Sequence, residues 1–263
     1  LGIWEKDRTE YFGFGQKNDA KFSFKEFGRI LVGNKGLRYL MISANTEKIG
    51  WMIYNSTVVY FYANILVNSS LQGTLATAAI IPTILASTVG PIIARKKGMK
   101  KIYVISNVCS LICIGGILLL RPDANYGMPL LIMIMLERAA ATVSVYLSNP
   151  MIADCADYEL YRTGRYIPGM VGSLFSFADK FVSSLSTFIL GVALAIAGYG
   201  DKVITPNVPA EGTLRTTLLI CMFVIPAVCH VVSLISMKFY PLDGKTMMKV
   251  QIENAQKRHQ AKN

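Results

Sequence analysis

The chain has 263 residues, of which 52% are hydrophobic and only 16% are charged, and its mean hydropathy is +0.41. An ordinary soluble domain carries about 25% charged residues, so this composition excludes that class and favours a membrane protein. The formal net charge of +11 would suit nucleic-acid binding, but the Lys and Arg residues cluster in short segments between apolar runs. That placement is typical of membrane-protein loops, and we expect no nucleic-acid partner.

The five cysteines lie in or beside the apolar runs and form no CxxC pair. We therefore expect free thiols rather than disulfides or a metal site. The sequence begins at Leu1 with no signal peptide ahead of the first apolar run, and we interpret it as the back portion of a longer protein.

Residues 1–36 are polar and basic, and we expect a cytoplasmic segment that contains one short amphipathic helix. Ser23 and Glu26 have the spacing of a capping box, and Phe27, Ile30 and Leu31 follow on one helical face. Such a helix would lie at the membrane interface. The alternative is a soluble coil.

Six apolar stretches follow, each long enough to cross a hydrocarbon layer of about 30 Å. They predict an all-α, polytopic bundle over residues 37–239, with spans at 37–67, 71–94, 102–120, 128–153, 169–198 and 213–239. Residues 240–263 form a basic, polar tail. Most of the 27 Lys and Arg residues fall on one side of this arrangement, which predicts a cell (inner) membrane protein with both ends in the cytoplasm.

Charged residues interrupt two of the earlier spans. Glu47 and Lys48 lie in the first, where they either snorkel to the inner surface or form an ion pair that faces a cavity. In the fourth span, Glu137 and Arg138 point about 100° apart. Glu137 is therefore a candidate for contact with a substrate, and an ion pair with another helix is an equal alternative.

The fifth span carries a carboxylate and an amine side by side, Asp179 and Lys180, where charge is costly and by default marks a functional site. Helical spacing places both on a polar stripe, opposite an apolar one; the polar stripe is Gly172, Ser176, Asp179, Lys180, Ser183 and Thr187. We expect the polar stripe to face a water-filled cavity. Packing of small residues would explain the serines but not the charges.

Between the fourth and fifth spans lies a run with three acids, Asp154, Asp157 and Glu159, and two arginines, Arg162 and Arg165. No histidine is near, which disfavours a metal or an acid–base site. We expect a cytoplasmic loop in which the acids pair with basic residues. The isolated His230 in the last span is interpreted as a hydrogen-bond donor between helices.

These stretches resemble a known family. The runs PMIADCADYELYRTGR (150–165) with Asp179-Lys180, KFSFKEFGRILVGNKGLRYL (21–40) and FYPLDGKTMMKVQI (239–252) are similar to the glycoside–pentoside–hexuronide:cation symporters, a sugar-carrying branch of the major facilitator superfamily. The resemblance implies that the chain is the C-terminal half, helices seven to twelve, of a twelve-helix carrier that performs no covalent chemistry and needs no cofactor.

The same resemblance implies roles for particular residues. Sugar would bind between two six-helix halves, with the coupling cation, Na⁺ or H⁺, held mainly by acids of the missing N-terminal half. Lys180 matches a helix-eleven lysine that supports the cation and sugar sites, and Ser176 and Asp179 would face sugar. Asp154, Asp157 and Arg165 match a loop that couples opening on the inner side.

Two other functions remain open from the residues. A half-length membrane protein could serve as a scaffold or subunit without transporting anything. A lipid carrier on the same fold would need an apolar side opening, whereas Ser176, Asp179 and Ser183 favour a polyol over an acyl chain.

Overall fold

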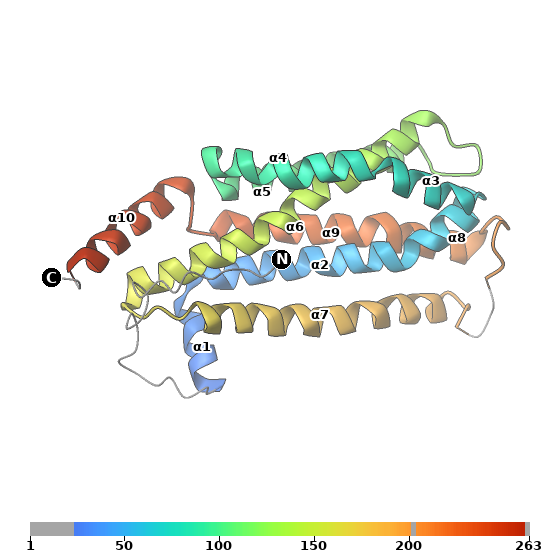
Figure 1. Ribbon diagram of the computed structural model, residues 1–263. Helices are drawn as coiled ribbons and strands as arrows, with labels where there is room; N and C mark the ends of the chain where they lie inside the picture. The colour runs from blue at the N-terminus through green and yellow to red at the C-terminus, as the bar shows by residue number, and fades with distance from the viewer. Residues whose placement is uncertain (1–23, 201–203, 261–263) are drawn as a thin grey trace, which may run out of the picture.

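The protein is a bundle of long helices packed side by side (Figure 1). The computed structural model describes residues 24–200 and 204–260, except for the side chains of residues 24, 186, 187 and 258–260. Within that part every regular element is a helix, in the order α1 (Phe24–Gly33), α2 (Lys35–Tyr60), η2 (Phe61–Ile65, a π-helical turn), α3 (Ser70–Ala78), α4 (Ile80–Lys97), α5 (Met99–Leu119), α6 (Met128–Thr163), α7 (Pro168–Ile196), α8 (Gly212–Leu219), η3 (Ile220–Val224, also π-helical), α9 (Ile225–Phe239) and α10 (Gly244–Gln260). The all-α prediction is confirmed.

Five helical stretches of the described residues are long and apolar enough to cross a membrane: Ser70–Lys97, Met99–Leu119, Met128–Thr163, Pro168–Ile196 and Gly212–Phe239. The chain is therefore a multi-pass membrane protein. Six spans were predicted. The predicted span that is missing from these five corresponds to α2, whose mean hydropathy is lowered by charged residues such as Glu47 and Lys48. Nevertheless α2 packs along both α9 and α7 in the middle of the bundle (Figure 1).

The second predicted span is broken at Ala79, between α3 and α4. Pro82 lies in the first turn of α4, where its missing N–H is tolerated but where a continuous helix through residue 79 would be disturbed. Pro91 lies inside α4 without ending it. Only the first of the two prolines therefore coincides with a break.

The predicted loop at Asp154 and Asp157 is wrong, because α6 continues through both residues to Thr163. Met151, Cys155 and Leu160 are buried at helical spacing and extend the apolar face beyond the predicted end at residue 153. The helix stops at Gly164, whose φ of +72° lies in the left-handed region that glycine tolerates.

Short helices cover one end of the bundle. α1 is amphipathic as predicted: Ile30 is buried, with Phe27 and Leu31 packed against the same core, while Arg29 is exposed. The predicted capping residue Ser23 lies outside the described residues. Asn34, fully buried between α1 and α2, donates from Nδ2 to the Cys155 carbonyl oxygen (2.9 Å), which ties this end to α6.

The basic tail contains a helix, α10, which packs against α6 through the buried residues Met247 and Val250. Asn254 Nδ2 donates to the Asp157 carbonyl oxygen at 2.9 Å. Asp243 caps α10 by accepting from the Thr246 N–H at 2.8 Å, and hydrogen bonding by Thr246 lowers the pKa of the Asp243 carboxyl. The tail is thus part of the folded structure.

Candidate functional site

Charged side chains from four helices gather inside the bundle, starting with two neighbours on α2. Glu47 and Lys48 project about 100° apart on the helix, so they reach different neighbouring helices. Glu47 is 8% exposed and contacts His230 of α9, whereas Lys48 forms an ion pair with Asp179 of α7, with Nζ and Oδ1 2.5 Å apart. Neither side chain snorkels, and the two do not pair with each other.

His230 is held by two side chains. Its Nδ1 lies 2.9 Å from Oε2 of Glu47 and 2.8 Å from Oδ1 of Asn107, which projects from α5. All three side chains are buried. The prediction that His230 is a hydrogen-bond donor between helices is confirmed, and it joins α2, α5 and α9.

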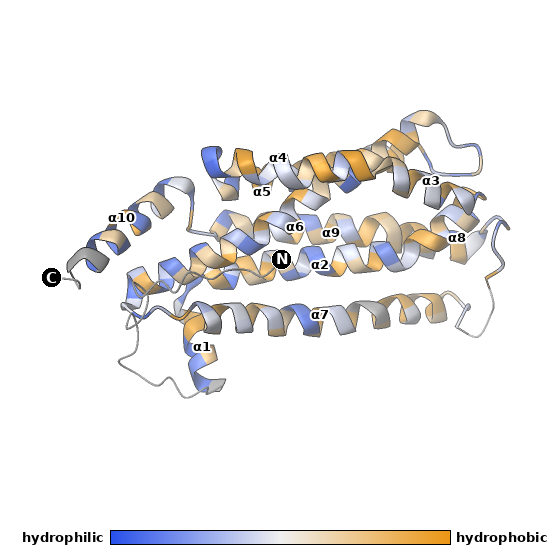
Figure 2. Ribbon diagram, viewed as in Figure 1, coloured by the Kyte–Doolittle hydropathy of each residue, from blue (hydrophilic) through white to orange (hydrophobic). Residues whose placement is uncertain are grey.

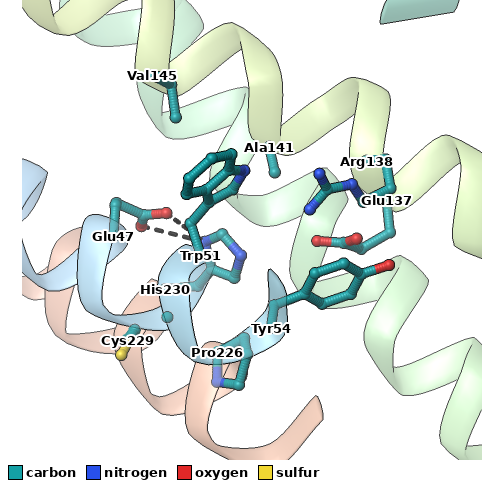
Figure 3. A pocket seen from close by; sticks show the side chains of 11 residues that line it. Glu47, Trp51, Tyr54, Glu137, Arg138, Ala141, Val145, Pro226, Cys229 and His230 are labelled. Carbon is teal, nitrogen blue, oxygen red and sulfur yellow. Dashed lines mark hydrogen bonds and ion pairs between the residues drawn. The ribbon is translucent and has the colours of Figure 1, made fainter. Parts of the chain in front are cut away.

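Glu137 and Arg138 occupy neighbouring places on α6 (Figure 3). The Arg138 guanidinium lies 4.4 Å from the centre of the Tyr54 ring and 6.0 Å from that of Trp51, a distance at which the rings attract a cation. Glu137 is 5% exposed and lines a cavity of about 20 Å³ together with Glu47 and His230. Both charges turn inward because α6 packs against α2, α4 and α5.

A larger cavity of about 280 Å³ opens between α2, α6 and α7. The Lys48–Asp179 pair lies in its wall, and the lining residues are Ala44, Glu47, Lys48, Trp51, Tyr103, Ser144, Val145, Ser148, Asn149, Phe175 and Asp179. Hydroxyl, amide and charged groups supply hydrogen bonds, while Trp51 and Phe175 supply apolar surface. Apolar surface with a few placed polar groups is the usual lining of a small-molecule site.

The structure separates the residues that were predicted together on α7. Asp179 lines the larger cavity, whereas Ser176 and Lys180 are exposed beside it. None of the ion pairs among the described residues involves Lys180. The side chain of Thr187 lies outside the described residues. The hydrophilic middle of α7, flanked by apolar turns, is visible in Figure 2.

The apolar stripe predicted on the opposite side of α7 is also exposed: Phe177 and Phe181 are 69% and 63% exposed. The face that packs against the bundle carries Val171 and Leu190 instead. α7 therefore exposes its apolar stripe, together with Ser176 and Lys180 of the polar one, to whatever surrounds this side of the bundle.

The acidic and basic residues at the end of α6 hold the short helices in place. Glu159 pairs with Arg162 at 2.8 Å, as predicted, and also accepts from Asn34. Arg165 does not pair with an acid of the same run; its Nη2 lies 2.7 Å from Oε1 of Glu26 on α1. These contacts link α1 to the end of α6.

Three residues of the site were not singled out from the sequence: Asn107, Trp51 and Tyr103. Asn107 carried a usable signal, because it is a polar residue in the middle of the apolar run 102–120. Trp51 and Tyr103 carried none, since aromatic side chains are ordinary in apolar helices.

Comparisons with known proteins show the family to which the sequence is related. Residues 6–244 match the family described as MFS/sugar transport protein. The uncharacterized symporter YnaJ of Bacillus subtilis (strain 168) is 26% identical over 246 residues, which are 92% of this chain and 51% of that protein. The glucuronide carrier protein homolog of Escherichia coli (strain K12) is 26% identical over 186 residues, 70% of this chain and 37% of that protein.

An uncharacterized 29.9 kDa protein in the crtE 3' region of Pseudescherichia vulneris is 28% identical over 107 residues, 40% of this chain and 38% of that protein. The chain thus spans about half the length, or less, of the curated relatives that it matches.

Proposed function

Because the chain belongs to the MFS/sugar transport protein family, whose members are transporters and not enzymes, we propose that it forms the C-terminal six-helix half of a cation-coupled sugar symporter. In this proposal α2 with η2 is the sixth span, both ends lie in the cytoplasm, and the cell membrane is the site of action. The other half supplies the facing cavity wall and most ligands of the coupling cation, Na⁺ or H⁺.

The observation that carries the proposal is the Lys48–Asp179 ion pair in the wall of the polar cavity between α2, α6 and α7. Charges at membrane depth are expensive and are retained where they line a substrate or ion pathway. Transporters of this kind bind substrate near the membrane midplane, between two repeats that rock around a fixed site. A cavity with one charged pair and several hydroxyl groups would hold a sugar there.

The charged and amide groups of the lining also favour sugar over lipid as the substrate. An acyl chain against Lys48, Asp179 and Asn149 would displace water from these groups without replacing its hydrogen bonds, which is costly. A scaffold without transport activity would have no use for an ion pair beside a cavity, and replacement of such a pair by apolar residues is often neutral or stabilising.

Uptake into proteoliposomes tests the proposal. The complete carrier, with this chain joined to its six-helix partner half, is expected to accumulate a radiolabelled glucuronide or galactoside above its equilibrium level when a Na⁺ or H⁺ gradient is imposed. Residues 1–263 alone are expected to accumulate neither sugar, because half of the cavity wall is absent.

Two results would count against this account. Accumulation by residues 1–263 alone would show that the cavity is completed in another way, for instance by a second copy of the chain. A complete carrier that inserts but accumulates neither sugar under either gradient would favour the scaffold instead.

A further inference from the structure

The partners of the buried histidine indicate which of its two ring nitrogens carries a proton. Asn107 Nδ2 donates to the Tyr103 carbonyl oxygen at 3.1 Å, and this bond turns Asn107 Oδ1 toward His230. Nδ1 of His230 therefore faces an amide oxygen and the Glu47 carboxylate, neither of which can donate to it when Glu47 is ionised. Nδ1 must be the donor, and Nε2 remains free to gain or lose a second proton.

The charges around the small cavity balance only when that second proton is present. Glu47 and Glu137 supply two carboxylates, and Arg138 supplies one permanent cation. Lys48 does not contribute, because its ammonium is paired with Asp179 on the other side of α2. A buried cluster with a net negative charge is unfavourable, so one further positive charge is needed.

There is room for that proton to be shared between His230 and Glu137. Both line the cavity of about 20 Å³, which is large enough for one water molecule. In Figure 3 the Nδ1 side of His230 is directed to Glu47, and the rest of the ring lies on the side of Glu137 and Tyr54. A single water could bridge the ring to the Glu137 carboxylate.

We propose that Glu47, His230 and Glu137 form a binding site for one exchangeable proton inside this half of the protein. The proton comes from hydronium in the surrounding water, whose O–H bond breaks to leave a water molecule, and it adds either to the lone pair of His230 Nε2 or to a carboxylate oxygen of Glu137. The coupling of proton binding to sugar binding depends on the proposed transport function. The proton site itself is inferred from the geometry and does not depend on that function.

Every helix packed around the cluster contributes groups that influence it. Besides Glu47, α2 brings Tyr54; α5 brings Tyr103 and Cys113; α6 brings Arg138 beside Glu137; and α9 brings Cys229 next to His230. Arg138 opposes proton binding, and the two carboxylates favour it. The remaining groups are neutral near pH 7, so they set the polarity of the site rather than its charge.

The proton site shares part of its wall with the larger cavity between α2, α6 and α7, because Glu47 and Trp51 line both. A change of charge at His230 acts on the Glu47 carboxylate directly, since the two are in contact at 2.9 Å. Protonation is therefore expected to alter the wall of the larger cavity without any long-range rearrangement.

Trp51 provides a reporter that needs no sugar. The fluorescence of Trp51 is obtained by subtracting the emission spectrum of the Trp51→Phe carrier from that of the unmodified complete carrier, both in lipid nanodiscs. We expect this emission to follow one single-proton transition between about pH 5 and 9, the range in which an imidazole changes charge. The midpoint of the transition should move in His230→Gln, whose side chain can still donate to Glu47 but leaves only the carboxylates to take up the proton.

Asn107→Asp keeps His230 and places a further carboxylate against Nδ1. It should move the midpoint of the transition to a more alkaline pH by about one unit or more. Glu253→Gln, on α10 and outside the cluster, is the matched control and should titrate like the unmodified carrier. A transition that is missing in the unmodified carrier, or that persists unchanged in His230→Gln, would overturn the proton site; so would a midpoint that Asn107→Asp leaves in place.

The outcome is separable from that of the uptake assay. If the carrier accumulates sugar but Trp51 fluorescence shows no transition, the proposed transport function is supported and the proposed proton site is refuted. A carrier whose Trp51 titrates as described but which accumulates no sugar keeps the proton site and loses the transport function.

Discussion

Asp179→Ala in the complete carrier is expected to reduce cation-driven sugar accumulation at least about tenfold, a loss that corresponds to about 1.4 kcal/mol. The substitution leaves the Lys48 ammonium in the cavity wall without its carboxylate. Breaking a fully buried pair costs about 3–5 kcal/mol, and an exposed pair about 0–1 kcal/mol. The two side chains are 28% and 36% exposed, so the cost lies between these limits.

The double variant Lys48→Ala/Asp179→Ala distinguishes the cost of an unpaired Lys48 ammonium from the loss of the Lys48–Asp179 ion pair itself. Because it leaves no unpaired charge, it should insert and resist heat better than Asp179→Ala alone, although sugar accumulation should stay low. The pair Lys249–Glu253 on α10, 3.8 Å apart and largely exposed, is the matched control, and its truncation should change neither property. A double variant that inserts and resists heat no better than Asp179→Ala would show that the unpaired Lys48 ammonium is not what destabilises the single variant.

Lys180→Ala is expected to abolish cation-driven accumulation while the protein still inserts. The Lys180 side chain is exposed on α7 next to Asp179, and an ammonium at membrane depth requires a partner. Glu137 is not that partner, because it lines the small cavity with His230. We therefore expect a carboxylate from the other half of the carrier to face Lys180 once the two halves meet.

Lys180→Arg should fail as well, since a planar guanidinium does not replace a compact ammonium. Lys238→Ala, which removes an exposed cation at the end of α9, is the control and should transport normally. Full Na⁺- or H⁺-coupled uptake by Lys180→Ala would mean that Lys180 takes no part in transport and only extends its ammonium toward the membrane surface.

The sequence predicted the helical class, the membrane location and most helix positions, because the apolar runs are long and separated by clustered cations. It could not predict that α6 continues through Asp154 and Asp157. Those acids suggested a loop, whereas burial of Cys155 and Leu160 on the other face of the helix keeps the chain helical. Polar residues on one face do not end a helix whose opposite face is packed.

The site was predictable only in its residue types. Charge at membrane depth identified Glu47, Glu137 and Asp179 as unusual, but their partners depend on how the helices are arranged. Lys48 with Asp179 and Glu47 with His230 are 131 and 183 residues apart in the sequence, and no local pattern connects them. The expected contact of Lys180 is with a group outside this chain, because in the proposed carrier the other half would supply the facing wall.

The most direct test of sugar binding in the cavity between α2, α6 and α7 is whether a sugar protects a cysteine placed there from alkylation. Asn149 is exposed and lines the cavity between α2, α6 and α7, so Asn149→Cys should react with N-ethylmaleimide in a carrier whose Cys109 and Cys113 are replaced by serine. Asn125→Cys, in the loop between α5 and α6, is the control. The account predicts that the glycoside accumulated in the uptake assay slows alkylation at position 149 and leaves position 125 unaffected. An unchanged rate at position 149, in a carrier that transports the same glycoside, would contradict it.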